Sequence, residues 1–235
     1  MRLLATALAI IGMSAGWHEA RADEARLCTG APDPAQVIEA CSALIKAAPG
    51  NLVAYTRRGN AHRSLGQLDK ALADHSTAIQ IDPDYSIAYA QRCLDHALLD
   101  AFEKALADCD KALSLTPAFY VAHANRGFAL ARAGDHAAAE AAYGEALARS
   151  PKYVRALNGR ALSRLRTGQA AAALADIDAA VAQRPTAASL LDTRGHVLEA
   201  LGRKAEAIAD FRKALAARPD LKESQDALVR LTRKR

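Results

Sequence analysis

The chain has 235 residues, of which 51% are apolar and 24% are charged, and this balance excludes an intrinsically disordered polypeptide. Aromatic residues make up only 5% and alanine is abundant, which favours closely packed helices over a strand-rich core. The formal net charge of +5 concerns solubility and nonspecific attraction to polyanions. By itself it assigns no nucleic-acid or membrane function.

The N-terminal stretch has the three parts of a secretory signal peptide. The run MRLLATALAIIGMSAG has one arginine followed by uncharged, mostly apolar residues, and Ala20-Arg21-Ala22 then forms an A-x-A cleavage pattern. A membrane anchor is the alternative, but the run is shorter than the ~20 residues that span a bilayer. We expect residues 1–22 to be removed and the rest to be exported to an oxidising compartment, most simply a bacterial periplasm.

Residues 52–221 contain five tandem segments of 34 residues that align without an insertion. Each segment closes with a proline, and alanine precedes that proline by twelve and by five residues. The segments are 52–85, 86–119, 120–153, 154–187 and 188–221, with prolines at Pro83, Pro117, Pro151, Pro185 and Pro219. The alanines are Ala71, Ala105, Ala139, Ala173 and Ala207, and then Ala78, Ala112, Ala146, Ala180 and Ala214. So regular a set indicates a true repeat.

Each segment carries two apolar patterns of helical period with a break between them. The break is a glycine in four segments and Asp100 in the second, and both residue types suit a helix end followed by a tight turn. A small residue in each first helix, together with the alanine that opens each second helix, should let the two helices approach closely. These small residues are Gly59, Cys93, Gly127, Ala161 and Gly195. Stacked hairpins would bury apolar faces that one hairpin cannot bury alone.

This framework resembles the tetratricopeptide-repeat (TPR) family over residues 52–221. The resemblance implies an all-α, right-handed superhelical solenoid of helix–turn–helix units. Residues 23–51 look like a degenerate leading half-repeat, and residues 222–235 like a capping helix with a basic tail. The family's aromatic position in the second helix is occupied by His75, Cys109, Tyr143, Ile177 and Phe211. The departures at His75, Cys109 and Ile177 predict a locally adjusted core.

Arginine and aspartate also recur with the repeat. Arginine precedes each small residue, at Arg58, Arg92, Arg126, Arg160 and Arg194. Aspartate lies in four second helices, at Asp74, Asp108, Asp176 and Asp210, with Ala142 in its place in the third repeat. The arginines could track a phosphate backbone, but few aromatic residues interleave with them. The pattern favours a ladder of ion pairs between helices instead, with Arg126 lacking this partner.

Four cysteines form two candidate disulfides. Cys28 and Cys41 flank the leading half-repeat, and Cys93 and Cys109 replace the small and the bulky residue of one hairpin, where their Cα atoms could fall within disulfide reach. Buried free thiols are the alternative. A metal site at Cys93-x-x-His96 is disfavoured because no second C-x-x-C or H-x-x-x-H pattern follows. We expect no metal and no cofactor.

No motif for catalysis is found in the sequence. The phosphate loop G-x-x-x-x-G-K-[ST] and the nucleophile motif G-x-S-x-G do not occur, and the acidic residues follow the repeat or lie near helix starts. We therefore predict a non-enzymatic protein without catalytic residues.

In the TPR family the first helices line a concave groove that holds a peptide or a partner helix, and the resemblance places this groove on matching positions. One end has Thr56, Asn60 and Arg63, and the other has Asp192, His196 and Glu199. The centre has Ala90, Leu94, Ala97, Val121, Ala124, Phe128, Asn158, Leu162 and Leu165, beside Arg132, Arg155 and Arg166. Such a surface suits a segment with hydrophobic anchors and some acidic groups. The leucines could instead pack between repeats.

Some family members bind a C-terminal carboxylate with a Lys-Asn-Asn-Lys-Arg set. Here the matching positions hold Thr56, Asn60, Gln91, Val121 and Asn125, so that clamp is disfavoured. The resemblance implies a scaffold or adaptor that binds another protein. A homo-oligomeric component of an envelope assembly is the alternative. Nucleic acid is disfavoured because an exported chain does not meet intracellular targets.

Overall fold

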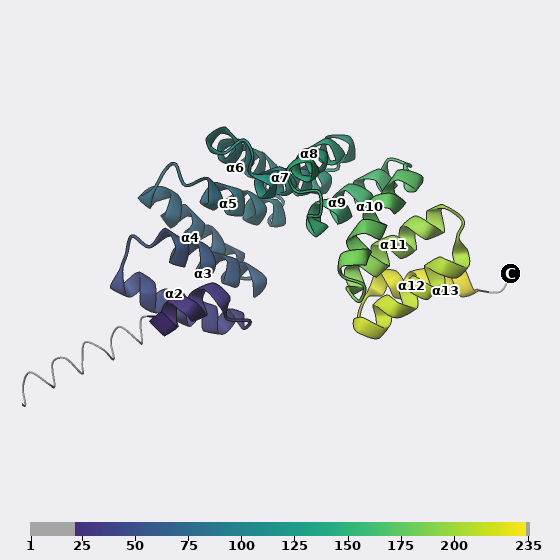
Figure 1. The fold of residues 1–235 in the computed structure, drawn as a ribbon, viewed down its shortest axis with the longest axis horizontal. Coiled ribbons are helices and arrows are strands. Elements are labelled where there is room, and N and C mark those ends of the chain that lie inside the picture. Colours follow the sequence, from purple (N-terminus) through teal and green to yellow (C-terminus); the bar gives the residue numbers. More distant parts are fainter. Residues whose placement is uncertain (1–21, 234–235) are drawn as a thin grey trace, which may run out of the picture.

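The computed structural model describes residues 22–233, which form helices and no strands, arranged as an arch (Figure 1). The predicted signal peptide falls on residues 1–22, almost all of which lie outside the described residues. Within the described part of the chain, no helix combines the length and the apolar character that a membrane crossing needs. The all-α solenoid predicted from the repeat is confirmed.

Each repeat forms a first helix of 13 residues and a second helix of 14 residues. The first helices are α3 (Leu52–Ser64), α5 (Ser86–Leu98), α7 (Tyr120–Arg132), α9 (Val154–Arg166) and α11 (Ala188–Ala200). The second helices are α4 (Leu68–Ile81), α6 (Phe102–Leu115), α8 (His136–Arg149), α10 (Ala170–Gln183) and α12 (Lys204–Ala217). A helix over residues 22–30 and α2 (Pro34–Ala47) precede them, and α13 (Lys222–Thr232) follows.

The turns between the two helices follow the sequence prediction. Four turns contain a glycine with positive φ, for example Gly134 at 90°, and Asp100 adopts φ 57° in the second repeat. Glycine reaches this left-handed region at no steric cost, and aspartate is one of the few other residues that tolerate it. The break in each repeat is therefore a tight reversal that sets the two helices side by side.

The curvature follows from which helices touch. Successive first helices contact one another along the whole series from α3 to α13, whereas the second helices of the described chain contact first helices only. Close approach on one side and separation on the other bends the stack. In Figure 1, α5, α7 and α9 lie on the inner side of the arch, with α6 and α8 outside them.

A bulky side chain of the second helix lies against the small residue of the first helix. A Cβ added at Gly195 would lie 2.6 Å from the ring of Phe211, and one at Gly59 would lie 2.7 Å from the ring of His75. The closest neighbour of the small residue is thus the bulky residue sixteen positions later, and not the alanine that opens the second helix. His75, Cys109 and Ile177 are fully buried, which confirms the adjusted core.

Candidate functional site

The repeated arginines form the predicted ion-pair ladder. In four repeats the guanidinium donates two hydrogen bonds, of 2.6–3.0 Å, to the aspartate of its own second helix. The pairs are Arg58–Asp74, Arg92–Asp108, Arg160–Asp176 and Arg194–Asp210. These hydrogen bonds raise the pKa of each of these four arginines above its ordinary value.

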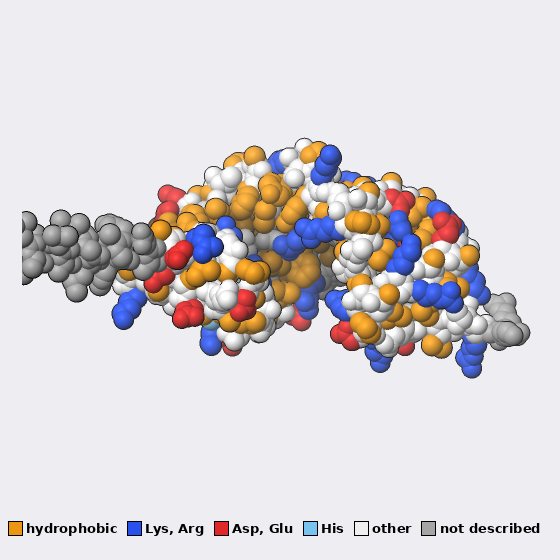
Figure 2. All heavy atoms as spheres, turned by 60° about the horizontal axis from the view of Figure 1, so that its bottom comes forward, with side chains coloured by type: hydrophobic (Ala, Val, Ile, Leu, Met, Phe, Trp, Pro, Cys, Tyr) orange, Lys and Arg blue, Asp and Glu red, His pale blue; other side chains and the backbone are white. Residues whose placement is uncertain are grey.

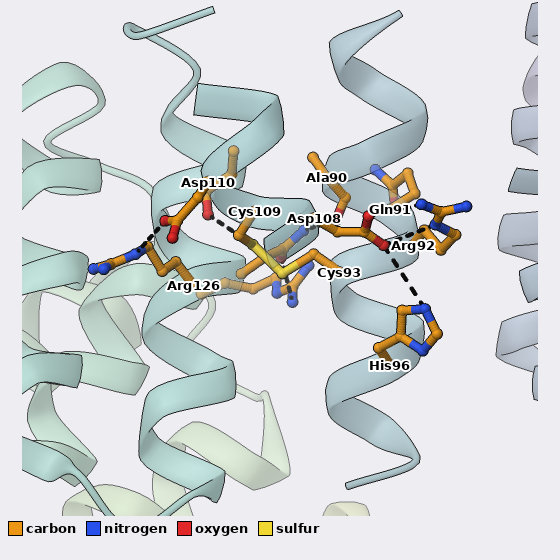
Figure 3. Close-up of a disulfide and its surroundings, with 12 residues drawn as sticks. Ala90, Gln91, Arg92, Cys93, His96, Asp108, Cys109, Asp110 and Arg126 are labelled. Carbon is orange, nitrogen blue, oxygen red and sulfur yellow. Dashed lines mark hydrogen bonds and ion pairs between the residues drawn. A yellow bond between two sulfur atoms is a disulfide. The ribbon is translucent and has the colours of Figure 1, made fainter. Parts of the chain in front are cut away.

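Arginines of the ladder also make a second set of contacts, which the sequence did not predict. Arg58 donates to Ser42 at 3.0 Å, Arg92 to Ser76 at 3.2 Å and Arg194 to Asp178 at 3.1 Å, so these three arginines also reach the preceding second helix. Arg126, whose own second helix has alanine at the aspartate position, pairs on this side with Asp110 at 2.9 Å (Figure 3). The prediction that Arg126 lacks the repeated partner is correct, but it has another. The ladder ties consecutive repeats together.

Both predicted cysteine pairs are joined in the structure. Disulfides link Cys28 to Cys41 and Cys93 to Cys109, with Cα–Cα distances of 4.9 and 5.3 Å. Figure 3 shows the second bond between α5 and α6, with the Arg92–Asp108 pair beside it. Because its sulfur is part of that bond, Cys93 is not a ligand for a metal beside His96. The described residues contain no group of three or more side chains arranged to hold a metal ion.

At the N-terminal end of the groove, the predicted binding residues belong to an internal network. Arg63 donates hydrogen bonds to Asn60 at 2.6 Å, to the side chain of Gln91 at 2.7 Å and to Asp95 at 2.9 Å. Asp95 is fully buried and also lies 2.5 Å from the Nδ1 atom of His75. These bonds satisfy the Arg63 guanidinium, so this side chain offers little to a ligand.

The floor of the groove in the second repeat and at the start of the third is also packed. Ala90, Ala97 and Ala124 are buried, and so is Leu94. These four predicted groove residues therefore pack between helices, and only 6% of Leu94 is exposed. Thr56 at the N-terminal end is buried as well, and its hydroxyl donates to the Leu52 carbonyl.

The C-terminal end of the groove is covered by α13. Ser224 of this helix donates a hydrogen bond to Asp192 at 2.5 Å, and Arg230 donates two to Glu199, at 2.9 and 2.7 Å. His196 packs edge-on against Phe211, with ring centroids 4.9 Å apart. The last helix thus satisfies the acidic residues that the resemblance placed in the groove.

The remaining predicted residues lie on α7 and α9, in the middle of the arch. Val121, Phe128, Asn158 and Leu165 are half-buried, and Leu162 is 37% exposed. Between the two helices lies a hollow of about 230 Å³. Its lining residues are Phe128, Ala131, Arg132, His136, Tyr143, Gly159, Leu162, Ser163 and Arg166. Figure 2 turns the open side of the arch forward and shows hydrophobic side chains gathered around a central hollow, with Lys or Arg side chains at its border.

Three arginines border this part of the groove. Arg132 donates to Asp100 at 2.7 Å and lies 5.9 Å from the centre of the Phe128 ring. Arg155 donates to the neutral Asn125 at 3.3 Å. Within the described residues, Arg166 makes neither an ion pair nor a side-chain hydrogen bond. The centre of the groove is therefore apolar with a positive border.

Five lining residues were missed, and two of them, His136 and Tyr143, belong to the second helix α8, whereas the prediction considered first helices only. The sequence assigns Tyr143 to the core, and it is indeed 4% exposed, but one edge of it faces the hollow. Desolvation raises the pKa of Tyr143, so its hydroxyl stays protonated. The positive φ and tight turn at Gly134 bring the start of α8 to the groove, and no pattern in the sequence marks this approach.

Comparison with family models finds tetratricopeptide repeats at residues 53–85, 125–188 and 188–221. Together these segments span more than half of the chain, which therefore belongs to the tetratricopeptide-repeat family. Proteins of this kind generally serve as protein–protein interaction scaffolds. No curated protein matches the chain.

Solved structures with the same fold share little sequence with this chain. A tetratricopeptide repeat protein from Parabacteroides merdae is 22% identical, with a TM-score of 0.68, over 85% of this chain and 78% of that one. PilW, described as a widely conserved type IV pilus biogenesis factor, is 24% identical, with a TM-score of 0.73, over 88% and 98%. YrrB, described as having an unusual peptide-binding site, is 19% identical, with a TM-score of 0.55, over 81% and 98%. At these identities the likeness concerns the fold alone.

Proposed function

We propose that this protein is an exported, non-enzymatic scaffold that binds a peptide or helix of another protein in the groove formed by α7 and α9. The observation that carries the proposal is the hollow between these helices, where Phe128 and Leu162 remain accessible beside Arg166, which has no acidic partner among the described residues. The two ends of the groove are occupied by the Arg63 network and by α13. A partner would therefore engage the centre.

Two further features support the proposal. YrrB, another protein of this fold, has an unusual peptide-binding site, and this supports peptide recognition by the present chain. The two disulfides and the N-terminal sequence favour export, since disulfides persist in oxidising compartments such as the periplasm.

Photo-crosslinking in cells that express the chain with its own N-terminus tests the groove. A photoreactive residue replaces Leu162 inside the groove, and the matched control replaces Gln183, which is exposed on the outer helix α10. We expect a discrete adduct from position 162 alone. It should disappear when Arg166 and Phe128 are both changed to Ala.

The mass of the adduct then separates the alternatives. An adduct with another protein supports the scaffold and identifies its partner. An adduct of twice the chain mass would instead favour the homo-oligomeric component. A discrete adduct from position 183, with none from position 162, would show that the working surface lies outside the groove.

A further inference from the structure

We propose that the hollow between α7, α8 and α9 is an anchor site for an acidic protein segment. It would take one bulky apolar side chain, while carboxylates next to that side chain pair with Arg166 and Arg132. This inference rests on the proposed function and specifies the chemical class of the partner. It also assigns ligand contacts to a second helix, which the resemblance to the family did not do.

The size and lining of the hollow suit a single apolar side chain. Phe128, Ala131 and Leu162 supply apolar walls, and the volume is about 230 Å³. An apolar cavity of about 150 Å³ already admits benzene, so the hollow can take a leucine or a phenylalanine side chain. Gly159 lets the ring of Tyr143 lie against α9 as one wall, because a Cβ at this position would overlap the ring.

The charge around the hollow is strongly one-sided. Helix α7 contains two arginines and α9 contains four, and neither helix contains Asp or Glu. Three of these, Arg126, Arg160 and Arg164, pair with acidic residues of the second helices. The other three, Arg132, Arg155 and Arg166, border the groove, and the structure gives only Arg132 an acidic partner. An acidic ligand complements this surface.

Two unsatisfied polar atoms point to a ligand independently of the charge. The Nδ1 atom of His136, which lines the hollow, is buried without a hydrogen-bond partner. The Oδ1 atom of Asn158, one helical turn before Leu162, is likewise buried and unpaired. A buried polar atom without a hydrogen-bond partner is destabilising. The carbonyl and N–H groups of a bound segment can supply the missing partners.

The position of the hollow also fits an anchor site. Towards the N-terminus the groove floor is closed by buried Ala90 and Leu94, and towards the C-terminus α13 covers α11. A segment that lies along the groove therefore finds an apolar recess at α7 and α9. Its flanking residues would lie over Arg132 and Arg166, which line the hollow.

Three synthetic pentapeptides, acetylated and amidated, test the proposal by amide-shift titration of the purified full chain with both disulfides formed. The first has a central leucine flanked by two glutamates on each side, the second replaces the glutamates by glutamines, and the third replaces the leucine by alanine. We expect the first to shift signals of α7 and α9. Either change should weaken binding at least ~10-fold, because each removes one of the two recognition elements.

Matched variants locate the effect. Arg166→Ala should weaken binding of the glutamate peptide by about the same factor as replacing its glutamates by glutamines does. Arg184→Ala removes an exposed charge after α10 and should leave the affinity for the glutamate peptide unchanged. Leu162→Ala should abolish the preference for leucine over alanine. Arg166 and Leu162 are exposed, so these changes leave the fold intact.

Equal binding of the glutamate and glutamine peptides would overturn the proposal, as would shifts outside α7–α9 or no shift at millimolar peptide. These failures differ from failure of the proposed function. If crosslinking at position 162 captures a partner but the peptides show no preference, the scaffold stands and the acidic anchor falls. If the peptide preference is found but nothing is captured, the anchor site stands and the scaffold falls.

Discussion

The two halves of this solenoid have the same backbone and are stabilised by different chemistry. From Ala124 to Leu221 one large apolar cluster joins the third, fourth and fifth repeats, and a smaller cluster around Phe211 lies at its C-terminal end. Before Ala124 the buried apolar residues form smaller clusters, two of which contain disulfides. A buried ionic network of Arg63, Asp95 and His75 joins the first two repeats.

The difference originates at one position of the repeat. Where the C-terminal half places Tyr143, Ile177 or Phe211 against the small residue, the N-terminal half has His75 and Cys109. A buried imidazole requires a polar partner, so Asp95 follows, and a buried carboxylate in turn requires Arg63. The repeat geometry therefore accepts an aromatic ring, an ion network or a disulfide in the same space, provided that each polar group is satisfied.

The largest effect should come from the apolar half. Phe211→Ala removes a fully buried ring that packs against Gly195, and we expect it to lower the free energy of unfolding by about 3–5 kcal/mol. Urea denaturation measures the loss, and hydrogen exchange should locate it in α11–α13. A loss below about 1 kcal/mol would mean that this half does not depend on its apolar core.

The equivalent position in the second repeat gives the next effect. Replacing both Cys93 and Cys109 by Ala opens a link across 16 residues, for which loop closure predicts a loss of about 3 kcal/mol. Hydrogen exchange should rise in α5 and α6 and stay unchanged in α11 and α12. As a control, reductant should destabilise α5 and α6 in the wild type and leave their stability in the double variant unaltered. An equal increase in hydrogen exchange over the whole solenoid would contradict the idea that the two halves are stabilised separately.

Two arginines of the ladder can be compared directly, because Arg92 pairs with a nearly buried aspartate and Arg126 with an exposed one. Arg92→Ala strands Asp108, whose side chain is only 10% exposed, and should cost about 2–3 kcal/mol. Arg126→Ala breaks a pair with the exposed Asp110 and should cost no more than about 1 kcal/mol. Chemical denaturation of the two variants side by side checks the order, and the reverse order would refute the ladder as a source of stability.

The smallest effect should be a difference in acid sensitivity. Burial lowers the pKa of His96, despite the nearby Asp108, so the folded chain favours the neutral imidazole. The unfolded chain then binds the proton more readily, and stability that is complete above about pH 6.5 is lost as the pH falls towards the lowered pKa. Arg164 occupies the same position in the fourth repeat. His96→Arg should therefore flatten the decline in the urea midpoint between about pH 7.5 and 5.5. An unchanged decline would exclude His96.

The sequence by itself determined the architecture. A 34-residue period with Gly, Ala and Pro in phase defines helix lengths, turns and stacking, because each of these depends on residues close together in the chain. The Arg–Asp ladder and the Cys93–Cys109 pair were also predictable, since sixteen residues separate the two partners and the hairpin brings them together.

Only the tertiary structure decided which part of the groove is open. Arg63 is a groove position by its place in the repeat, yet Gln91 and Asp95 of the next repeat satisfy it. Asp192 and Glu199 are covered because α13 packs on α11. Whether a side chain is free depends on neighbours contributed by other repeats. The packing of α8 against α7 and α9 also brings Tyr143 and His136 to the hollow.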